Sequence, residues 1–308
     1  MNEILSYEEI SLVAQAAAEL GIKYLKVTGG EPLVRKGCPE LIGMLKAIPG
    51  IEKVTITTNG VLLAEHLNDL IDAGIDGINV SLDTMNDERF AKITGYDRLK
   101  QVLYAVHAAM KRDVKVKLNV VSLDFAQIGT NKSEANTADG TQDLIPKDWV
   151  ELIEFARKNP VDVRFIEMMP IGYGRNFPAV GHDKLLIALQ TLYPGLTVDG
   201  RSHGFGPAVY FRIPGYAGGI GLISAIHGKF CNSCNRVRLT STGYLKSCLC
   251  FEDGVDLRTI LRVDASGGER WMQLVDSMQK AIYAKPGAHC FENSEKITEY
   301  RDMVSIGG

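Results

Sequence analysis

The chain has 308 residues, of which 45% are hydrophobic and 23% charged, and this composition is typical of a folded globular protein of one or two domains. Its 34 basic and 37 acidic residues nearly balance, which excludes the broad positive field of a nucleic-acid or anionic-membrane binder and leaves only local anion sites. The sequence shows no apolar run of the roughly 18 residues that a membrane span needs, and no signal-peptide pattern. We therefore expect a protein that is not secreted, in the reducing cytoplasm of a bacterium or the mitochondrial matrix of a eukaryote. Six cysteines there indicate metal ligands or free thiols.

Helical and strand patterns alternate through the first half of the chain. Ser6 and Glu9 form a capping box, which predicts a helix that starts beside them and ends near Gly21. Hydrophobic periodicity then predicts strands at 22–27, 54–57, 77–82, 114–121 and 161–167, and helices at 39–47, 63–73, 87–93, 98–111 and 149–157. Such alternation builds a parallel sheet, and right-handed crossovers curl it into a full or partial barrel.

The second half of the chain begins with an interruption. Residues 122–146 are polar and lack periodicity, so we expect a disordered insert. Beyond the fifth strand, the pattern predicts a helix at 183–192, short strands at 196–198, 208–213 and 219–224, and a last helix at 271–284. We expect a boundary near 177–180 that divides the chain into domains 1–178 and 179–308, the second of them mainly antiparallel α+β.

Four of the six cysteines lie within residues 230–250. Two residues separate Cys231 from Cys234, thirteen separate Cys234 from Cys248, and one separates Cys248 from Cys250, which is metal-ligand spacing. Three thiolates on a 4Fe-4S cubane leave one iron open for a substrate atom, whereas four thiolates on zinc form a closed structural site. Spacing alone leaves a zinc ribbon, a cluster and plain reduced thiols open.

The cysteine pairs are joined by a predicted hairpin with strands at 235–239 and 243–246. Arg236 and Arg238 are two residues apart on its first strand, so both guanidinium groups leave the same face, beside the sulfurs. This pair favours an anionic ligand, although a solvated strand face is the alternative.

Polar residues and glycines follow the predicted parallel strands, at the edge where α/β sheets bind ligands. Gly29 and Gly30 allow the backbone to approach a ligand, and Glu31 or nearby carbonyls could hold an ammonium group. The other polar positions are Lys26, Thr57, Asn79, Ser81, Asp83, Lys117, Asn119, Arg164 and Glu167, followed by Met169. Lys26, Lys117 and Arg164 could bind phosphates, although each of them taken alone is typical of a surface charge. Met169 taken alone is typical of a core residue.

Taken together, these motifs resemble a known family. The segments are TGGEPLVR at 28–35, TTNG at 57–60, INVSLDT at 78–84, ITGYD at 93–97, RFIEMMPIG at 164–172, FCNSCNRVRLT at 230–240 with Cys248, and the terminal Gly-Gly. They are similar to the radical S-adenosylmethionine GTP 3′,8-cyclases of molybdenum-cofactor biosynthesis, from about residue 5 to 308 apart from the insert.

The resemblance implies an α/β fold in which a partial (β/α) barrel holds S-adenosylmethionine and a first 4Fe-4S cluster. A C-terminal domain holds a second cluster, with GTP between them. It further implies a lyase that converts GTP to (8S)-3′,8-cyclo-7,8-dihydroguanosine 5′-triphosphate, through a 5′-deoxyadenosyl radical that takes hydrogen from C3′ before C8 is attacked. GTP is thus the expected partner, and a homodimer is an assembly to test.

The family's binding residues carry over position by position. Gly30, with Gly29 and Glu31 in the same turn, matches the methionine-binding turn, and Ser81 and Met169 match adenosylmethionine contacts. Residues that match GTP-facing positions are Thr57, Lys117, Arg164, Arg236 and Arg238, with Lys26 where the family usually has arginine. Cys231, Cys234 and Cys248 match the ligands of the second cluster, and Cys250 stands where phenylalanine is usual. The Gly-Gly tail matches one that reaches the active site. No catalytic residue is assigned.

One departure concerns the first cluster. The family's CxxxCxxC motif, in a segment that also supplies the first barrel strand, is absent, and Cys38 is the only cysteine before Cys231. We therefore expect either a truncated start or a natural variant, no S-adenosylmethionine cleavage by this chain, and an open edge at strand 22–27 that promotes self-association. The alternative functions are a non-catalytic iron–sulfur nucleotide-binding variant and a zinc ribbon on an inert barrel.

Overall fold

The computed structural model describes residues 3–123, 145–177, 180–264 and 266–306. Helices and strands alternate through α1 (Tyr7–Glu19), β1 (Tyr24–Val27), α2 (Cys38–Lys46), β2 (Lys53–Thr58), α3 (Leu63–Asp72), β3 (Gly77–Ser81), α4 (Asp87–Thr94), α5 (Leu99–Met110), β4 (Val116–Ser122), α6 (Lys147–Lys158) and β5 (Asp162–Glu167). The capping box is confirmed, because the Ser6 side chain accepts from the Glu9 amide and the Glu9 carboxylate accepts from the Ser6 amide. Most of the expected insert at 122–146 lies outside the described residues.

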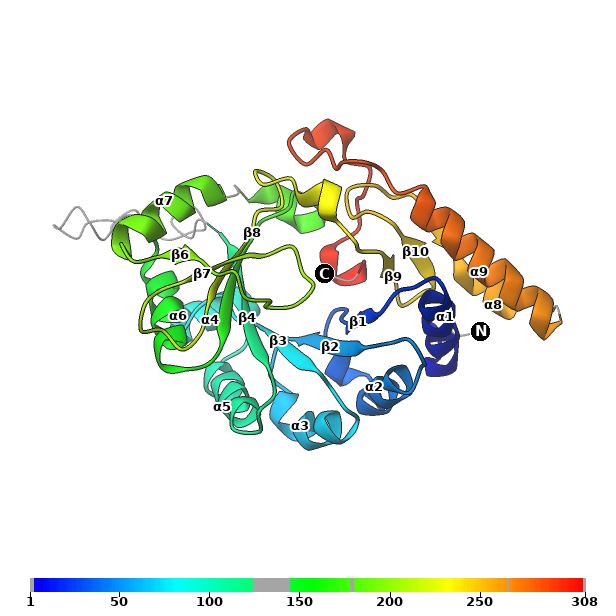
Figure 1. Ribbon diagram of the computed structural model, residues 1–308, viewed down its shortest axis with the longest axis horizontal. Coiled ribbons are helices and arrows are strands. Elements are labelled where there is room, and N and C mark those ends of the chain that lie inside the picture. The colour runs from blue at the N-terminus through cyan, green and yellow to red at the C-terminus, as the bar shows by residue number, and fades with distance from the viewer. Residues whose placement is uncertain (1–2, 124–144, 178–179, 265, 307–308) are drawn as a thin grey trace.

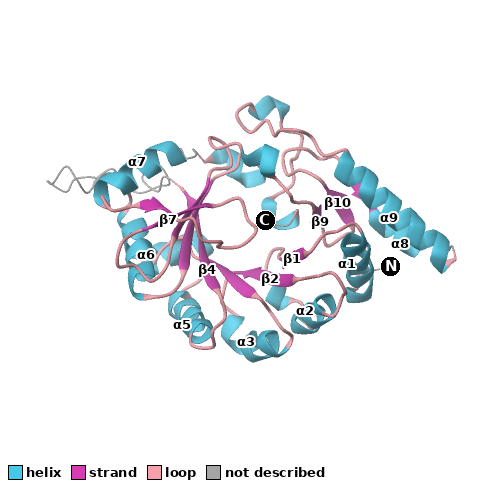
Figure 2. Cartoon of the chain, in the orientation of Figure 1, coloured by secondary structure: helices cyan, strands magenta, loops and turns pink. Residues whose placement is uncertain are grey.

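The strands β1 to β5 form a parallel, curved sheet in chain order, as the sequence predicts. Helices α2, α3, α5 and α6 lie along its outer side (Figures 1 and 2), and the main hydrophobic core fills the space between these helices and the sheet. Strand β1 is the end of the strand order. Among the described residues it pairs with β2 alone, so one side of β1 is an open edge.

The same sheet continues beyond β5 with elements that the sequence places in the second domain. After α7 (His182–Leu192) come β6 (Thr197–Val198), β7 (Val209–Arg212) and β8 (Ile220–Ile223). Strand β8 pairs in parallel with β5, and β7 and β6 follow in antiparallel pairing. Strands β6 to β8 therefore extend the barrel sheet, although they follow the predicted boundary near 177–180. Gly221 on β8 allows β5 and β7 to pack closely on either side, because a Cβ there would lie 3.0 Å from the side chains of Arg164 and Tyr210. The division at 178/179 itself stays a prediction.

A second, antiparallel sheet follows, built from β9 (Arg238–Leu239), β10 (Tyr244–Lys246) and β11 (Gly254–Asp256). The predicted cysteine hairpin is confirmed, although its first strand is shorter than expected because only Arg238 and Leu239 have partners on β10. Helices α8 (Leu257–Arg262) and α9 (Gly267–Tyr283) come next. Helix α9 starts before the predicted residue 271, since Ser266 and Glu269 form a second capping box that compensates for two glycines.

A smaller hydrophobic core joins the two ends of the chain. Leu5, Val13 and Ala17 from the amino-terminal segment and α1 pack with Leu257 and Leu274 from α8 and α9. The packing of α1 against α9 thus fixes the second sheet beside the open end of the barrel (Figure 1).

No helix in the described part of the chain is both long enough and apolar enough to cross a membrane.

Candidate active site

Five cationic side chains from both sheets gather inside the barrel. Lys26 on β1 is accessible to solvent there, yet protein surrounds it on most sides. Burial, followed by the charges of Arg164, Arg236, Arg238 and Lys117, lowers the pKa of Lys26 to about 7. A group of like charges held this close needs an anion to neutralise it, and guanidinium groups are well suited to phosphate or carboxylate. The structure thus brings together all five basic residues that the sequence selects.

Arg164 is the most firmly held of these cations. Its side chain is only 6% exposed, and its Nη2 donates to Asn79 Oδ1 at 2.6 Å and Asn119 Oδ1 at 2.5 Å. The Asn79 amide in turn donates to the Ile56 carbonyl at 3.0 Å and to Thr57 Oγ1 at 3.4 Å. Neutral amides orient this guanidinium without cancelling its charge. Its Nε is buried and has no hydrogen-bond partner among the described residues, so donor capacity is left for a ligand.

Lys117 on β4 is shared between the site and the loop that joins β6 to β7. Its Nζ donates to the His203 carbonyl and to the Tyr210 hydroxyl at 3.0 Å, and lies 3.5 Å from Asp162 Oδ2. Burial and then Arg164 lower the pKa of Lys117 to about 8, although Asp162 opposes this. The His203 ring stacks on Tyr210 with centroids 4.0 Å apart. Lys117 therefore holds the loop between β6 and β7 in place and also contributes positive charge to the barrel interior.

The turn after β1 is built around Glu31. Its Oε1 accepts from the Leu33 amide at 3.0 Å and from Thr58 Oγ1 at 2.8 Å, and its Oε2 accepts from the Asn59 amide at 2.6 Å. The carboxylate therefore ties the turn to the end of β2. At Gly29 and Gly30, no atom of the described residues lies within 4 Å of where a Cβ would be, apart from the neighbours in the chain, and Gly29 has a φ of 156°. Open space beside bare backbone permits a ligand to approach the main chain.

The other two predicted cofactor-binding residues lie at the same edge of the sheet. Ser81 ends β3 and is exposed. Met169 follows β5 and is half-buried, where it packs beside a small core that includes Ile171, Phe291 and Ile306. Thus Met169 connects the edge of the barrel sheet to the carboxy-terminal segment.

The three cysteines with ligand spacing lie beside the cationic group. Cys231 lies in the short 3-10 turn η6 (Phe230–Ser233), Cys234 directly follows it, and Cys248 follows β10. Each sulfur accepts an N–H donor: the His289 amide at 3.3 Å from Cys231, the Lys285 ammonium at 3.3 Å from Cys234, and the Cys250 amide at 3.5 Å from Cys248. Such donors stabilise sulfur in its anionic form.

The charges around these cysteines act on their acidity in different ways. Burial opposes the ionisation of Cys234, but the Arg236 amide and guanidinium and the Lys285 ammonium outweigh it and lower its pKa. Burial raises the pKa of Cys248. Burial and the charge of Arg236 lower the pKa of Arg238 to about 10, whereas the thiols of Cys234 and Cys248 act to raise it. The cysteine site and the cationic site therefore share one electrostatic environment.

The described residues include no group of three His, Cys, Asp or Glu side chains arranged as ligands of a single metal ion. Cys231 and Cys234 are nevertheless within electrostatic reach of Cys248. The sulfur of Cys250 lies 3.1 Å from that of Cys290, and all six cysteines are free thiols.

The carboxy-terminal segment is anchored across both sheets. Asp302 Oδ1 accepts from the Tyr173 amide at 3.0 Å, and Arg175 donates to the Glu299 carbonyl at 2.8 Å. Ile306, the last described residue, is fully buried. Figure 1 shows this end of the chain near the centre of the view. The Gly-Gly tail predicted to reach the active site lies outside the described residues.

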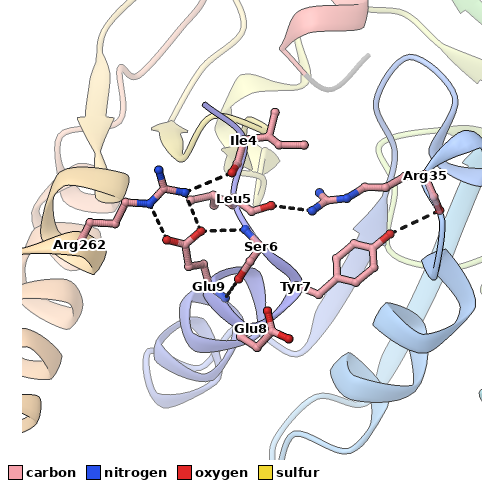
Figure 3. A pocket seen from close by; sticks show the side chains of 8 residues that line it. All are labelled: Ile4, Leu5, Ser6, Tyr7, Glu8, Glu9, Arg35 and Arg262. Carbon is pink, nitrogen blue, oxygen red and sulfur yellow. Dashed lines mark hydrogen bonds and ion pairs between the residues drawn. The ribbon is translucent and has the colours of Figure 1, made fainter. Parts of the chain in front are cut away.

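A pocket of about 450 Å³ lies elsewhere, where the amino-terminal segment meets α8 and the turn after β1. Figure 3 shows that its charged groups face one another: Arg262 pairs with Glu9 at 2.6 Å, and Arg35 donates to the Leu5 carbonyl at 2.6 Å. Tyr7 donates from its hydroxyl to the Lys36 carbonyl at 3.1 Å. These interactions join distant segments of the chain, and the pocket is a structural junction.

Sequence reasoning missed several residues that shape the site. Lys285 and His289 contact the cysteine sulfurs, and Asp162 and His203 hold Lys117. None of these forms a motif with its partners, because the partners are tens of residues away in sequence.

Comparison with known proteins agrees with this geometry. The chain matches the family models of the Radical SAM superfamily over residues 2–139 and of Molybdenum Cofactor Synthesis C over residues 161–291. The structure of Streptococcus suis SuiB bound to S-adenosylmethionine is similar to this chain, with a TM-score of 0.60 and 12% sequence identity. The superposition covers 98% of this chain and 70% of the SuiB chain, which shows a shared fold. The chain therefore has the fold of the Radical SAM superfamily.

Sequence relatives identify the family within this class. The GTP 3′,8-cyclase of Clostridium perfringens (strain SM101 / Type A) is 39% identical over 309 residues, and that of Heliobacterium modesticaldum is 38% identical over 320 residues. Each alignment covers 100% of this chain and 88% of the relative. The chain belongs to the GTP 3′,8-cyclase family, as its sequence motifs predict.

Proposed function

We propose that this chain binds GTP between the barrel and the second sheet and acts in its 3′,8-cyclisation, a step of molybdenum-cofactor synthesis. The observation that carries the proposal is the group of Lys26, Lys117, Arg164, Arg236 and Arg238 beside three cysteines. A triphosphate carries up to about four negative charges, which neutralise most of the charge of these five side chains.

The residues divide the work of holding the nucleotide. Arg164 is fixed by Asn79 and Asn119, so it presents its charge without having to be ordered on binding. Arg236 and Arg238 lie on the side of the second sheet, beside the cysteine sulfurs. Rigid placement of C3′ and C8 relative to each other is the main contribution that the protein makes to a cyclisation.

The cysteine trio fits a 4Fe-4S cluster. Cys231, Cys234 and Cys248 each accept an N–H donor, which is the surrounding that anionic cluster sulfur needs. A cubane places its thiolates on separate irons, so its ligands need not converge on one ion as zinc ligands do. Bound there, the cluster would supply an open iron as a Lewis acid for the purine. Six free thiols suit a reducing compartment.

S-adenosylmethionine fits the edge formed by the turn after β1. Gly29 and Gly30 leave room for its methionine part, with Ser81 and Met169 on neighbouring loops of the same edge. The cluster that would cleave it does not fit this chain, because Cys38 is the only cysteine before Cys231 and is buried in the barrel core. We therefore derive no radical step from these residues.

The test is GTP affinity, measured by calorimetry on protein prepared without oxygen and loaded with iron and sulfide. Arg236→Ala and Lys26→Ala should each weaken binding about 10- to 100-fold, since a hydrogen bond to a charged group contributes about 1.5–3 kcal/mol and about 1.4 kcal/mol corresponds to tenfold. Lys23→Ala is the matched control, because Lys23 forms an exposed pair with Glu52 at 2.8 Å. Unchanged affinity in both site variants would refute the proposal. With added S-adenosylmethionine and reductant, these 308 residues should form no 5′-deoxyadenosine, because Cys38 is the only cysteine before Cys231.

A further inference from the structure

Two cysteines outside the proposed cluster site face each other closely. The sulfurs of Cys250 and Cys290 are 3.1 Å apart, although 40 positions separate them in sequence. The Cys290 amide also donates to the Cys250 sulfur at 3.3 Å, which fixes how the two residues meet. A disulfide bond is about 2.05 Å long, so the two sulfurs have to approach each other by only about 1 Å to form one.

The two thiols differ in accessibility. Cys250 is fully buried, in a small core with Ile171, Leu249 and Phe291, whereas Cys290 is partly exposed at the rim of that core. An incoming reagent therefore reaches the sulfur of Cys290 first, and Cys250 stands directly behind it. This is the arrangement of an attacking and a resolving thiol.

We propose that Cys250 and Cys290 form a reversible disulfide by exchange with a low-molecular-weight disulfide such as oxidised glutathione. Cys290 loses its proton to water and attacks one sulfur of the reagent, so a mixed disulfide forms and one thiolate leaves and is protonated. Cys250 then loses its proton and attacks the Cys290 sulfur, which releases the second reagent thiol. Two protein thiols are oxidised and one reagent disulfide is reduced to two thiols.

The position of the cross-link gives it a role at the neighbouring site. Cys250 is two residues beyond Cys248, and Cys290 directly follows His289, whose amide donates to the Cys231 sulfur. The disulfide therefore joins the segments on both sides of the cysteine trio. Oxidants that destroy an iron–sulfur cluster would at the same time lock its hairpin to the carboxy-terminal segment, so that the emptied site keeps its shape.

The first experiment counts thiols in cluster-loaded protein incubated without oxygen in oxidised glutathione, then alkylated, digested and analysed by mass spectrometry. Of six cysteines, three are held by the cluster, which leaves Cys38, Cys250 and Cys290. We expect two of these to resist alkylation and to appear as one cross-linked peptide that dithiothreitol reverses. Cys290→Ser should abolish the cross-link, and Cys38→Ala, which removes a buried thiol elsewhere, should leave it unchanged. Stable glutathione on Cys290, or both thiols still open to alkylation, would overturn the proposal; neither outcome depends on a variant.

The second experiment measures the role of the cross-link. Protein is first treated with oxidised glutathione, its cluster is then removed by air and chelator, and the protein is reloaded with iron and sulfide. Wild type should recover a larger fraction of its iron than Cys290→Ser treated in the same way. Equal recovery would show that the cross-link does not protect the site.

Discussion

The buried ion pair between Lys246 and Glu299 offers the sharpest test of how the carboxy-terminal segment is held. The two side chains are 0% and 1% exposed, with Nζ and Oε2 2.5 Å apart. Lys246 also donates to the Phe251 carbonyl at 2.6 Å, and the Glu299 carboxylate accepts three bonds from Arg301, from its amide, Nε and Nη2, at 2.9 Å each. Glu299→Gln keeps the shape of the side chain but removes the charge opposite a fully buried ammonium.

This change should lower the free energy of unfolding by about 3–5 kcal/mol, the usual cost of an uncompensated buried charge. The matched control is Glu292→Gln. Glu292 pairs with Lys229 at 2.5 Å, but both side chains are about half exposed (47% and 51%), so its loss should cost about 0–1 kcal/mol. Urea unfolding of both variants measures the difference. The double variant Lys246→Met with Glu299→Gln should recover much of the loss, because no fully buried charge is then left without a partner, and Arg301 is 43% exposed.

The same pair predicts an acid dependence. Burial would raise the pKa of Glu299, but the bonds from Arg301 and Lys246 outweigh it and lower the pKa to about 2. An unfolded glutamate titrates near about 4.3, so the stabilisation is present above that pH and is lost as the pH falls toward about 2. Wild type should therefore lose more stability than Glu299→Gln between pH 5 and 3. Equal costs for the Glu299 and Glu292 variants, or parallel acid profiles, would refute this reasoning.

Three further outcomes follow from the structure. Gly60→Ala should cost about 1–3 kcal/mol in urea unfolding, because Gly60 has a φ of +82° and a Cβ there would lie 2.9 Å from Val102 and 3.0 Å from Val80; Gly30→Ala, in open space, is the control, and equal costs would contradict it. GTP affinity should fall as the pH rises from about 6 to 8, because burial and nearby cations bring the pKa of Lys26 to about 7, and calorimetry on Lys26→Arg should show a flatter profile. The open edge of β1 should cause concentration-dependent association in sedimentation, whereas a 33.7 kDa monomer at every concentration would disprove that expectation.

Much of the barrel was predictable because helices and strands have recognisable patterns in the local sequence. Periodicity located β1 to β5 and their helices, and the Ser6 to Glu9 capping box marked the start of α1 correctly. Short elements escaped, since β11 and α8 have too few residues for a period to be recognised. The pairing of the strands within 196–224 could not be predicted, because their sequence specifies extended structure but not the neighbour with which each strand pairs.

The candidate site also has features that the sequence predicts and features that only the tertiary structure reveals. Residue spacing and motifs determined which side chains could act, because the cysteine trio, the paired arginines and the glycine turn after β1 each form a recognisable local pattern. Only the tertiary structure decided which of them meet, how Asn79 and Asn119 orient Arg164, and that Cys250 faces Cys290 while Lys246 is buried against Glu299. The reason is physical: local patterns reflect backbone preferences over one or two turns, whereas a contact across 40 or more residues depends on how every intervening element packs.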